Sequence, residues 1–461
     1  MGQTNILLTH GYFLYEDEKE QEIMRPYVPL GLLYLSAYLK EQSYSVEVFD
    51  STFEKRKGLY EKFKENPAGI IGLYTNLMTR ASVIEIIKQA KLNQWTVITG
   101  GPESANYVED YLKCGADFVV SGEGEQTMSE LLSALLFEKK SFDNIAGLSF
   151  YDKNNKLVKT NSRDLPRNIS QYPWPDRDAI DIDKYFSVWK EHHGESSVSL
   201  ITARGCPYKC KWCSHAVFGY SHRRRDAAEV ADELEHIVNK YNPTTVWYAD
   251  DVFTIHHRWL YSYAEELEKR NIKVPFETIS RADRMMDDKV VRTLKELGCY
   301  RIWIGAESGS QRLLDQMQRQ VTIEQVYRAT KSAQSYCIEV GMFLMWGYGD
   351  ENLADIDETV KQVVRINPDI YLTTVAYPIK GTEYFKENED KISSNIIWQE
   401  GSDRDYQIEN RQSSRYYRLA NKYLKLSVDS ARLSNSEPSK SKMKRRHAVK
   451  TRQLLEMALN D

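Results

Sequence analysis

The amino-acid sequence predicts an α/β protein made of two successive units with parallel sheets, followed by a short and mostly helical C-terminal region. Short runs of β-branched and aliphatic residues alternate with segments of helical spacing through both halves of the chain, which is the pattern of parallel strands covered by helices. Residues 161–183 interrupt this alternation with a stretch rich in Pro, Asp and Arg, as a linker between two units does. A chain of 461 residues can bury a core in each unit.

The first half predicts a doubly wound open sheet, the class of domain that binds ligands beyond the carboxyl ends of its strands. Glycines follow two of the expected strands: Gly100 and Gly101 after one, and Gly122, with Glu123 beside it, after the next. Glycine allows a ligand to approach the backbone closely, although any tight turn from strand to helix can also use it. The expected strands are 5–9, 46–50, 70–75, 96–100 and 118–121, and the expected helices are 30–40, 81–91 and 125–136.

The second half continues the alternation, and polar residues stand where its strands end. The carboxyl ends of the strands form the active site in barrels of this kind. An acid just before a helix can instead be an N-cap, and Arg281 can pair with Asp283 or Asp287 instead of a ligand. The expected strands are 197–202, 244–248, 274–279, 301–305, 338–346 and 370–375, and the expected helices are 227–239, 259–268 and 290–297.

These patterns predict four segments: a first domain over 1–140, a linker over 141–195, a second domain over 196–385 and a helical region over 386–461. Within the last segment, residues 413–433 have helical spacing. Residues 440–452 then hold seven Lys or Arg in thirteen positions. Such a basic tail can bind phosphate, an acidic lipid surface or an acidic partner, and more often it is simply solvated.

Composition and charge favour a cytoplasmic enzyme. The net charge of −4 provides no basic field, so nucleic acid is not an expected partner. No apolar run approaches the length of a membrane span, and the first residues lack the layout of a signal peptide. Six cysteines in the whole chain are too few for a disulfide-stabilised secreted protein.

The three cysteines Cys206, Cys210 and Cys213 lie within eight residues, with the spacing C-x3-C-x2-C. Thiolates this close on one loop favour a shared soft metal. A structural zinc site would need a fourth ligand, and His215 could supply it only with poor tetrahedral geometry. Three ligands on a four-iron cluster would leave one iron open to a small molecule.

The motif Cys206-x3-Cys210-x-Trp212-Cys213 resembles the signature of the radical S-adenosylmethionine superfamily. The resemblance implies a partial (β/α)6 barrel and a [4Fe–4S] cluster held by the three cysteines. The open iron would bind S-adenosylmethionine, and reduction by a donor such as flavodoxin or ferredoxin would yield a 5′-deoxyadenosyl radical. It also implies contacts with S-adenosylmethionine for residues near the cluster or at strand ends: Trp212, Asp250, Arg281, Glu307, Ser308, Gly341 and Gly347.

The first half resembles the cobalamin-binding, Rossmann-like domain that precedes the barrel in some of these proteins. The resemblance rests on the segments around Gly31, Asp50, Gly100-Gly101 and Gly122-Glu123, and Thr75 keeps a hydroxyl where the family pattern has Ser. It implies that Thr75, Gly100, Gly101, Gly122 and Glu123 contact cobalamin. Residues 26–31 lack the histidine that ligates cobalt in methionine-synthase-like domains, so the resemblance implies a five-coordinate or water-bound cobalt.

The combination is similar to the cobalamin-dependent radical S-adenosylmethionine proteins, a class with ester cyclases and many methyltransferases. We therefore expect methylation of an unactivated carbon of a small molecule or natural product. The alternative is radical oxidation, cyclisation or rearrangement without methyl transfer, with or without cobalamin. A protein that only holds a cluster would form no 5′-deoxyadenosine.

Overall fold

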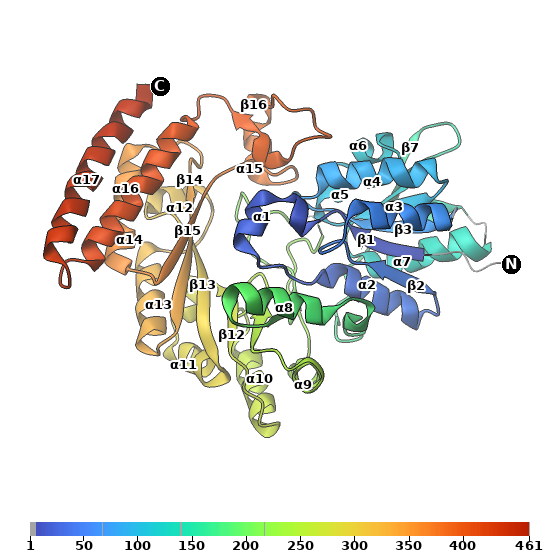
Figure 1. Ribbon diagram of the computed structural model, residues 1–461, viewed down its shortest axis with the longest axis horizontal. Helices are drawn as coiled ribbons and strands as arrows, with labels where there is room; N and C mark the ends of the chain where they lie inside the picture. The colour runs from blue at the N-terminus through green and yellow to red at the C-terminus, as the bar shows by residue number, and fades with distance from the viewer. Residues whose placement is uncertain (1–5, 67, 139–140, 216, 461) are drawn as a thin grey trace.

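The computed structural model describes residues 6–66, 68–138, 141–215 and 217–460, so the first residue of the strand expected over 5–9 lies outside the described part. Two parallel sheets organise the chain, and a helical hairpin follows them (Figure 1). The blue first unit lies at one end of the long axis, the second sheet lies in the middle, and the red C-terminal helices lie at the other end. The predicted α/β class is confirmed.

The first sheet has the strand order β2-β1-β3-β4-β5-β6-β7, and its first five strands are parallel. These central strands are nearly continuous apolar runs because helices cover both faces. Helices α3, α4 and α6 pack on one face with Trp95, whereas α2 and α7 pack on the other. The strands are β1 (Ile6–His10), β2 (Val46–Phe49), β3 (Ile70–Tyr74), β4 (Thr96–Gly100), β5 (Phe118–Val120), β6 (Leu148–Tyr151) and β7 (Leu157–Lys159). The helices are α1 (Glu18–Ile23), α2 (Leu30–Glu41), α3 (Arg56–Glu65), α4 (Arg80–Leu92), α5 (Pro102–Asn106), α6 (Val108–Lys113) and α7 (Gly124–Ser133).

The second sheet has six parallel strands in the order β15-β14-β13-β12-β11-β8, so chain neighbours are also sheet neighbours. Alternate strand residues such as Val246, Ile302 and Val340 pack under the covering helices in one large core. The strands are β8 (Ser197–Leu200), β11 (Thr245–Tyr248), β12 (Phe276–Ser280), β13 (Cys299–Glu307), β14 (Glu339–Trp346) and β15 (Ile370–Val375). The helices are α9 (Ala227–Tyr241), α10 (His257–Lys269), α11 (Asp288–Leu297), α12 (Gln311–Gln316), α13 (Ile323–Ser335) and α14 (Leu353–Ile366).

The segment expected as a linker has regular structure of its own. Strands β6 and β7 extend the first sheet as an antiparallel hairpin, and α8 (Ile182–His193) precedes the second sheet. Runs of three or four residues at a sheet edge are too short to show in the periodicity of a sequence. The domain limits drawn from the sequence stay a prediction.

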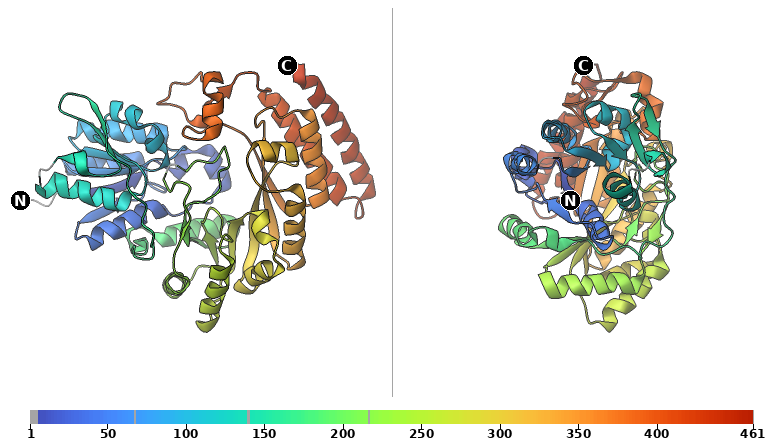
Figure 2. Two further views of the ribbon diagram at one scale, coloured as in Figure 1. Left: turned by 180° about the vertical axis from the view of Figure 1, so that it is seen from behind. Right: turned by 90° about the vertical axis from the view of Figure 1, so that its right-hand side faces the viewer.

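The basic run over 440–452 is not a solvated tail. It lies in α17 (Pro438–Met457), which packs along α16 (Ser414–Arg432) as a hairpin, and this hairpin packs on α14. Arg452 pairs with Asp357 of α14 at 2.7 Å, and Lys444 pairs with Asp429 of α16 at 2.5 Å. Figure 2 shows the hairpin at the end of the molecule away from the first unit.

Residues 379–411, here called the strap, run back from the second unit to the first. The strap contains α15 (Glu383–Asn388) and the small antiparallel pair β16 (Ile392–Ser393) and β17 (Gln407–Ile408). Its Asp403 forms a buried ion pair with Arg80 of α4. In the described part of the chain, we find no helix with the length and apolar character needed to cross a membrane.

Candidate functional site

The three cysteines lie on one loop, residues 205–222, which we call the cysteine loop. Two short antiparallel strands, β9 (Ala203–Arg204) and β10 (Arg223–Arg224), form its base. Gly205 has φ +84°, and a Cβ there would collide with the carbonyl oxygen of Ser221. The loop can therefore leave its base only through a residue without a side chain.

The charges around the cysteines suit an anionic metal cluster. Nη1 of Arg281 lies 4.0 Å from Sγ of Cys210, and Nη1 of Arg319 lies 3.8 Å from the same sulfur. Desolvation by neighbouring protein atoms, with a contribution from the charge of Asp251, raises the pKa of the Cys213 thiol to about 12, although the residue is exposed on one side. Deprotonation of the Cys213 thiol is therefore favoured by a cation bound to its sulfur, as a metal supplies.

The described residues contain no three His, Cys, Asp or Glu side chains that converge on the position of a single metal ion. A cluster sets a different requirement, because each thiolate binds its own iron and the sulfurs need not share a centre. The donor set of three thiols beside two guanidinium groups fits a cluster.

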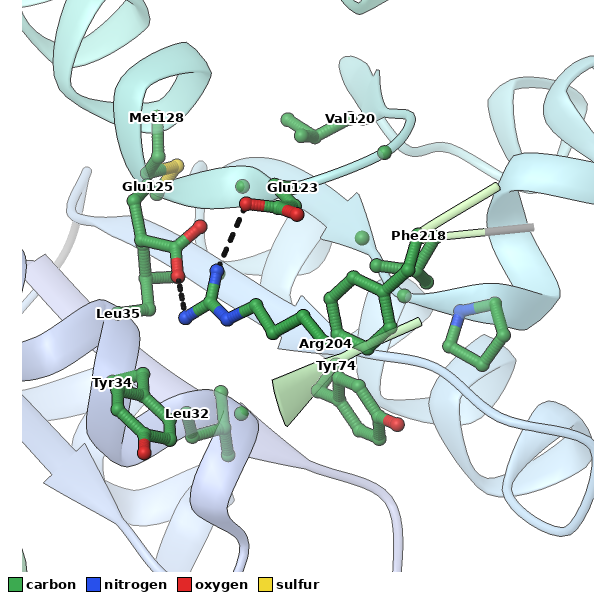
Figure 3. A pocket seen from close by; sticks show the side chains of 18 of the residues that line it. Leu32, Tyr34, Leu35, Tyr74, Val120, Glu123, Glu125, Met128, Arg204 and Phe218 are labelled. Atoms are coloured by element: carbon green, nitrogen blue, oxygen red, sulfur yellow. Dashed lines mark hydrogen bonds and ion pairs between the residues drawn. The ribbon is translucent and has the colours of Figure 1, made fainter. Parts of the chain in front are cut away.

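A cavity of about 420 Å³ lies between the strand ends of the first unit and the cysteine loop (Figure 3). Gly100, Gly101, Gly122 and Glu123 are in its wall, as expected from the sequence. From the other side, Arg204, Gly205, His215, Phe218 and Asp251 complete it. The cavity is therefore built from both units.

The glycines make one wall of this cavity open. A Cβ added at Gly31 or Gly100 would come no nearer than 3.7 Å to other atoms, and one at Gly122 no nearer than 3.9 Å. Thr75 is fully buried behind this wall, where its hydroxyl donates to the carbonyl of Gly100 at 3.0 Å and accepts from the amide of Ser104 at 2.9 Å. Its hydroxyl therefore supports the wall instead of facing the cavity.

Asp250 and its neighbour Asp251 have different surroundings. The carboxylate of Asp250 accepts hydrogen bonds from the amides of Thr202 and Ala203 at 2.7 and 3.1 Å, and it pairs with Arg224. Only 2% exposed, Asp250 holds the base of the cysteine loop. Asp251 instead is exposed and lines the cavity, where desolvation by the surrounding wall and the charge of Asp250 raise its pKa to about 6.

Arg281, Glu307 and Ser308 lie at strand ends, but each has protein partners. Nε of Arg281 pairs with Asp283 at 2.9 Å, which is the alternative that its sequence left open. Glu307 follows a bulge in β13, has φ +62° and lies 3.9 Å from Arg319. Burial raises the pKa of Glu307. The hydroxyl of Ser308 accepts from the amide of Ser310 at 3.1 Å, so it shapes the turn after β13.

Gly341, Gly347 and Trp212 lie away from the cavity. Gly341 leaves room for the indole of Trp303, which a Cβ would overlap. Gly347 has φ +69° and donates its amide to Glu351 at 2.6 Å. Trp212 packs edge-on to Tyr348, with ring centroids 6.3 Å apart, beside the cysteine loop. Packing and backbone conformation therefore explain why glycine occupies these two positions, without a contact to a ligand.

The comparisons with known proteins agree with this geometry. Residues 200–363, which contain the cysteine loop, match the model of the radical SAM superfamily, where SAM is S-adenosylmethionine. Residues 23–132, which contain the glycine wall, match the model of the B12 binding domain. The chain is a radical SAM enzyme with a B12-binding domain.

Several relatives align with this chain over most of its length. This radical SAM enzyme is 29% identical over 378 residues to an uncharacterised methyltransferase of Pyrococcus horikoshii, covering 80% of this chain and 79% of the relative. It is 26% identical over 383 residues to an anaerobic magnesium-protoporphyrin IX monomethyl ester cyclase of Rubrivivax gelatinosus, covering 80% and 68%. The fold is similar to that of the methyltransferase TsrM of Kitasatospora setae, at TM-score 0.71 and 17% identity, covering 86% and 78%.

The cofactors of these two domain families are a [4Fe–4S] cluster with S-adenosylmethionine and cobalamin. The residues of this radical SAM enzyme fit them. Three thiols beside cationic groups suit the cluster, and a mostly apolar cavity with a glycine wall suits a large flat ligand.

Four residues of this site were not among those assigned from the sequence: Arg204, Phe218, Asp251 and Arg319. Asp251 had a signal, because it directly follows Asp250 at a strand end. Arg319 and Phe218 had none, since each reaches the site through a loop whose path only the folded chain determines.

Proposed function

We propose that this radical SAM enzyme uses cobalamin to methylate an unactivated carbon of a small molecule or natural product. The observation that carries the proposal is the position of the cavity. It is enclosed on one side by the glycine wall of the B12-binding domain and on the other by the loop with the three cysteines. A ligand in this cavity would meet a group bound at the cysteine loop without bulk water between them.

The proposal assigns the residues as follows. Cys206, Cys210 and Cys213 would hold the cluster, and Gly100, Gly101 and Gly122 would face the corrin. When bound, the cluster with S-adenosylmethionine supplies a radical that abstracts hydrogen, and cobalamin supplies the methyl group.

The chain's own residues would position these groups. We propose that Asp251, with its carboxylate at the cavity near the cysteine loop, holds the ammonium group of S-adenosylmethionine in place of Asp250. Arg281 and Arg319 would stabilise the negative charge of the thiolates by their cationic field. Trp212 and Glu307 would complete the surroundings of the cluster.

The methyltransferase from Pyrococcus horikoshii supports methyl transfer, because it aligns with this chain over 79% of its own length. The ester cyclase relative favours a second candidate, a radical oxidation or cyclisation without methyl transfer. Both reactions would use the same residues to generate the radical. They differ in whether the product gains a methyl group.

The test begins with anaerobic purification, cluster reconstitution and addition of hydroxocobalamin. We expect about four irons, together with bound cobalt and 5′-deoxyadenosine on reduction with S-adenosylmethionine. Isotope-labelled methyl groups would then distinguish methylation from cyclisation. A Cys210→Ala variant should lose iron, whereas Cys337→Ala, an exposed cysteine outside the loop, should retain it. Absence of iron from the parent protein would overturn the proposal.

We also propose a one-electron donor such as flavodoxin or ferredoxin as a partner, and the cytoplasm as the compartment. All six cysteines are free thiols, as a reducing compartment would keep them. An oxygen-labile cluster also requires a reducing compartment. Reduction of the reconstituted cluster by flavodoxin in place of dithionite would test the partner.

A further inference from the structure

Two arginines face each other at the base of the cysteine loop. Arg204 of β9 and Arg223 of β10 are direct partners in the antiparallel pairing, and they are 6% and 9% exposed. Two buried guanidinium groups this close repel each other unless an anion compensates them. The carboxylate of Glu123 does so: one oxygen lies 3.0 Å from Nη1 of Arg204, and the other binds Arg223.

Glu123 comes from the other unit of the molecule. It follows β5 of the B12-binding domain and precedes α7, where Gly122 forms part of the cavity wall. Its partners are 81 and 100 residues away in the chain. One buried carboxylate therefore joins the wall of the proposed cobalamin cavity to both strands of the cysteine loop.

The position of Arg204 is further restricted. Nη2 of Arg204 binds Glu125 of α7 at 2.6 Å, as the dashed lines in Figure 3 show together with the bond to Glu123. The guanidinium also lies 5.2 Å from the ring of Tyr34 and 5.1 Å from the ring of Tyr172. A planar group held by two carboxylates and two rings has little freedom to move.

The next two arginines have partners in the second unit. Arg224 pairs with Asp250 at the end of β11, and Arg225 pairs with Glu233 of α9 at 2.5 Å. Each therefore anchors the loop base to the barrel. The contacts of Glu123 are of another kind, because they connect the loop base to the first unit.

We propose that Glu123 is a positioning residue that sets the distance between the cluster on the cysteine loop and the cobalamin in the cavity. Both of its carboxylate oxygens are occupied by arginines, so it acts through them and not by touching a cofactor. The inference rests on the proposed function, since it takes both cofactors to be bound. Distance matters because a misplacement of about 1 Å between reacting groups can cost about 100-fold in rate.

The test measures that distance directly in the loaded protein. A reduced cluster and cob(II)alamin each carry an unpaired electron, and pulsed electron paramagnetic resonance reports the spacing of such spins. We expect one narrow distance in the parent protein. In Glu123→Gln, which keeps the shape and removes the charge, the charge-assisted contacts with Arg204 and Arg223 are weakened, and we expect a broadened or shifted distribution.

The matched control is Glu130→Gln, on the same helix α7 as Glu125. Glu130 pairs with Arg163 outside the cavity wall and is 48% exposed. This variant should have the distance distribution of the parent. If Glu123→Gln also keeps the parent distribution, the carboxylate contributes only to stability and the inference is wrong.

A second variant, Glu125→Gln, allows the test to proceed if Glu123→Gln does not fold. Glu125→Gln leaves Glu123 in place and removes one of the two carboxylates on Arg204. We expect a smaller broadening of the same distribution, because Arg204, through which Glu123 acts, is then held less tightly. An unchanged distribution would show that the position of Arg204 does not set the distance, and it would overturn the inference. A parent protein that binds no cobalamin or no cluster would instead contradict the proposed function, so the two failures are distinguishable.

Discussion

At the scale of single residues, the site separates side chains that support the loop from side chains that face the cavity. Asp250 and Asp251 are adjacent in the chain. The carboxylate of Asp250 is hydrogen-bonded by backbone amides and paired with Arg224, whereas that of Asp251 lines the cavity. The same division separates Thr75, which braces the glycine wall, from Gly100, which forms it. At this scale, a side chain that lines the cavity, such as Asp251, can bind a ligand, whereas one already bound by the protein, such as Asp250, supports the loop.

Asp251 should make the stability of the protein depend on pH. Desolvation by the cavity wall and the charge of Asp250 raise the pKa of Asp251 from 3.8 to about 6, so the folded state binds a proton more tightly than the unfolded state does. Stability from this group is complete below pH 3.8 and is lost as the pH rises through about 6. We expect Asp251→Asn to remove this loss and to unfold at higher urea than the parent at pH 8.

Urea unfolding of the protein without cofactors, from pH 4.5 to 8, would check this expectation. Asp315→Asn is a suitable control because Asp315 is an exposed aspartate far from the cavity wall. It should keep the parent pH dependence. A parallel pH dependence in Asp251→Asn and the parent would contradict the assignment.

Gly100 should be required for cobalamin binding. A Cβ there has nothing nearer than 3.7 Å, and its φ is ordinary, so Gly100→Leu should fold and place its side chain in the cavity. Overpacking of this kind costs about 1–3 kcal/mol, so cobalamin should bind about 5- to 150-fold more weakly. Absorbance titration with hydroxocobalamin measures this. Gly58→Leu on α3, where a Cβ is equally unhindered at 3.8 Å, should bind as the parent does.

At the scale of secondary-structure elements, the C-terminal hairpin completes the second unit. Helix α16 covers α14, and α17 covers α16, so the strongly basic run becomes one face of a packed helix. Few apolar residues make this contact: Ala448 and Leu455 of α17 are buried, and so is Ala458 directly after the helix. Their sparse spacing explains why the helix was not apparent from the sequence.

Leu455→Ala tests whether α17 is structural. The side chain is fully buried in the core of the second unit, so its truncation should cost about 2–5 kcal/mol. We expect a lower urea midpoint and faster hydrogen exchange in α16 and α17. Met457→Ala, at a side chain that is 68% exposed, should change the free energy of unfolding by less than about 0.5 kcal/mol. Equal effects of the two substitutions would mean that α17 is not packed.

At the scale of the whole molecule, two sets of buried charges hold the two units together. One is Glu123 with Arg204 and Arg223 at the cysteine loop. The other is Arg80, which pairs with Glu103 of the first unit and Asp403 of the strap at 2.5 Å each. The strap thus connects the second unit back to the first. Arg80 and Glu103 lie on α4 and α5, the helices that follow β3 and β4.

Asp403→Asn should release the strap. It leaves Arg80 buried with only one carboxylate, and breaking a buried pair costs about 3–5 kcal/mol. We expect limited proteolysis to cut residues 389–411 faster than in the parent. Glu85→Gln removes a carboxylate from the exposed pair with Arg56, which is worth less than about 1 kcal/mol, and should leave the digestion rate unchanged. Equal digestion of Asp403→Asn and the parent would show that the pair does not hold the strap.

Two parallel sheets, the cysteine motif and the glycines at the ends of β4 and β5 could all be predicted from the sequence. Hydrophobic periodicity and residue spacing are local properties, which the chain carries whether or not it is folded. Only the tertiary structure decided that Asp251 and not Asp250 faces the cavity, and that Glu123 binds Arg204 and Arg223. It also decided that Arg80 meets Asp403 across 323 residues. Such pairs form because the packing of the two units excludes water and leaves buried charges with each other as partners, and no local pattern in the chain records which charges will meet.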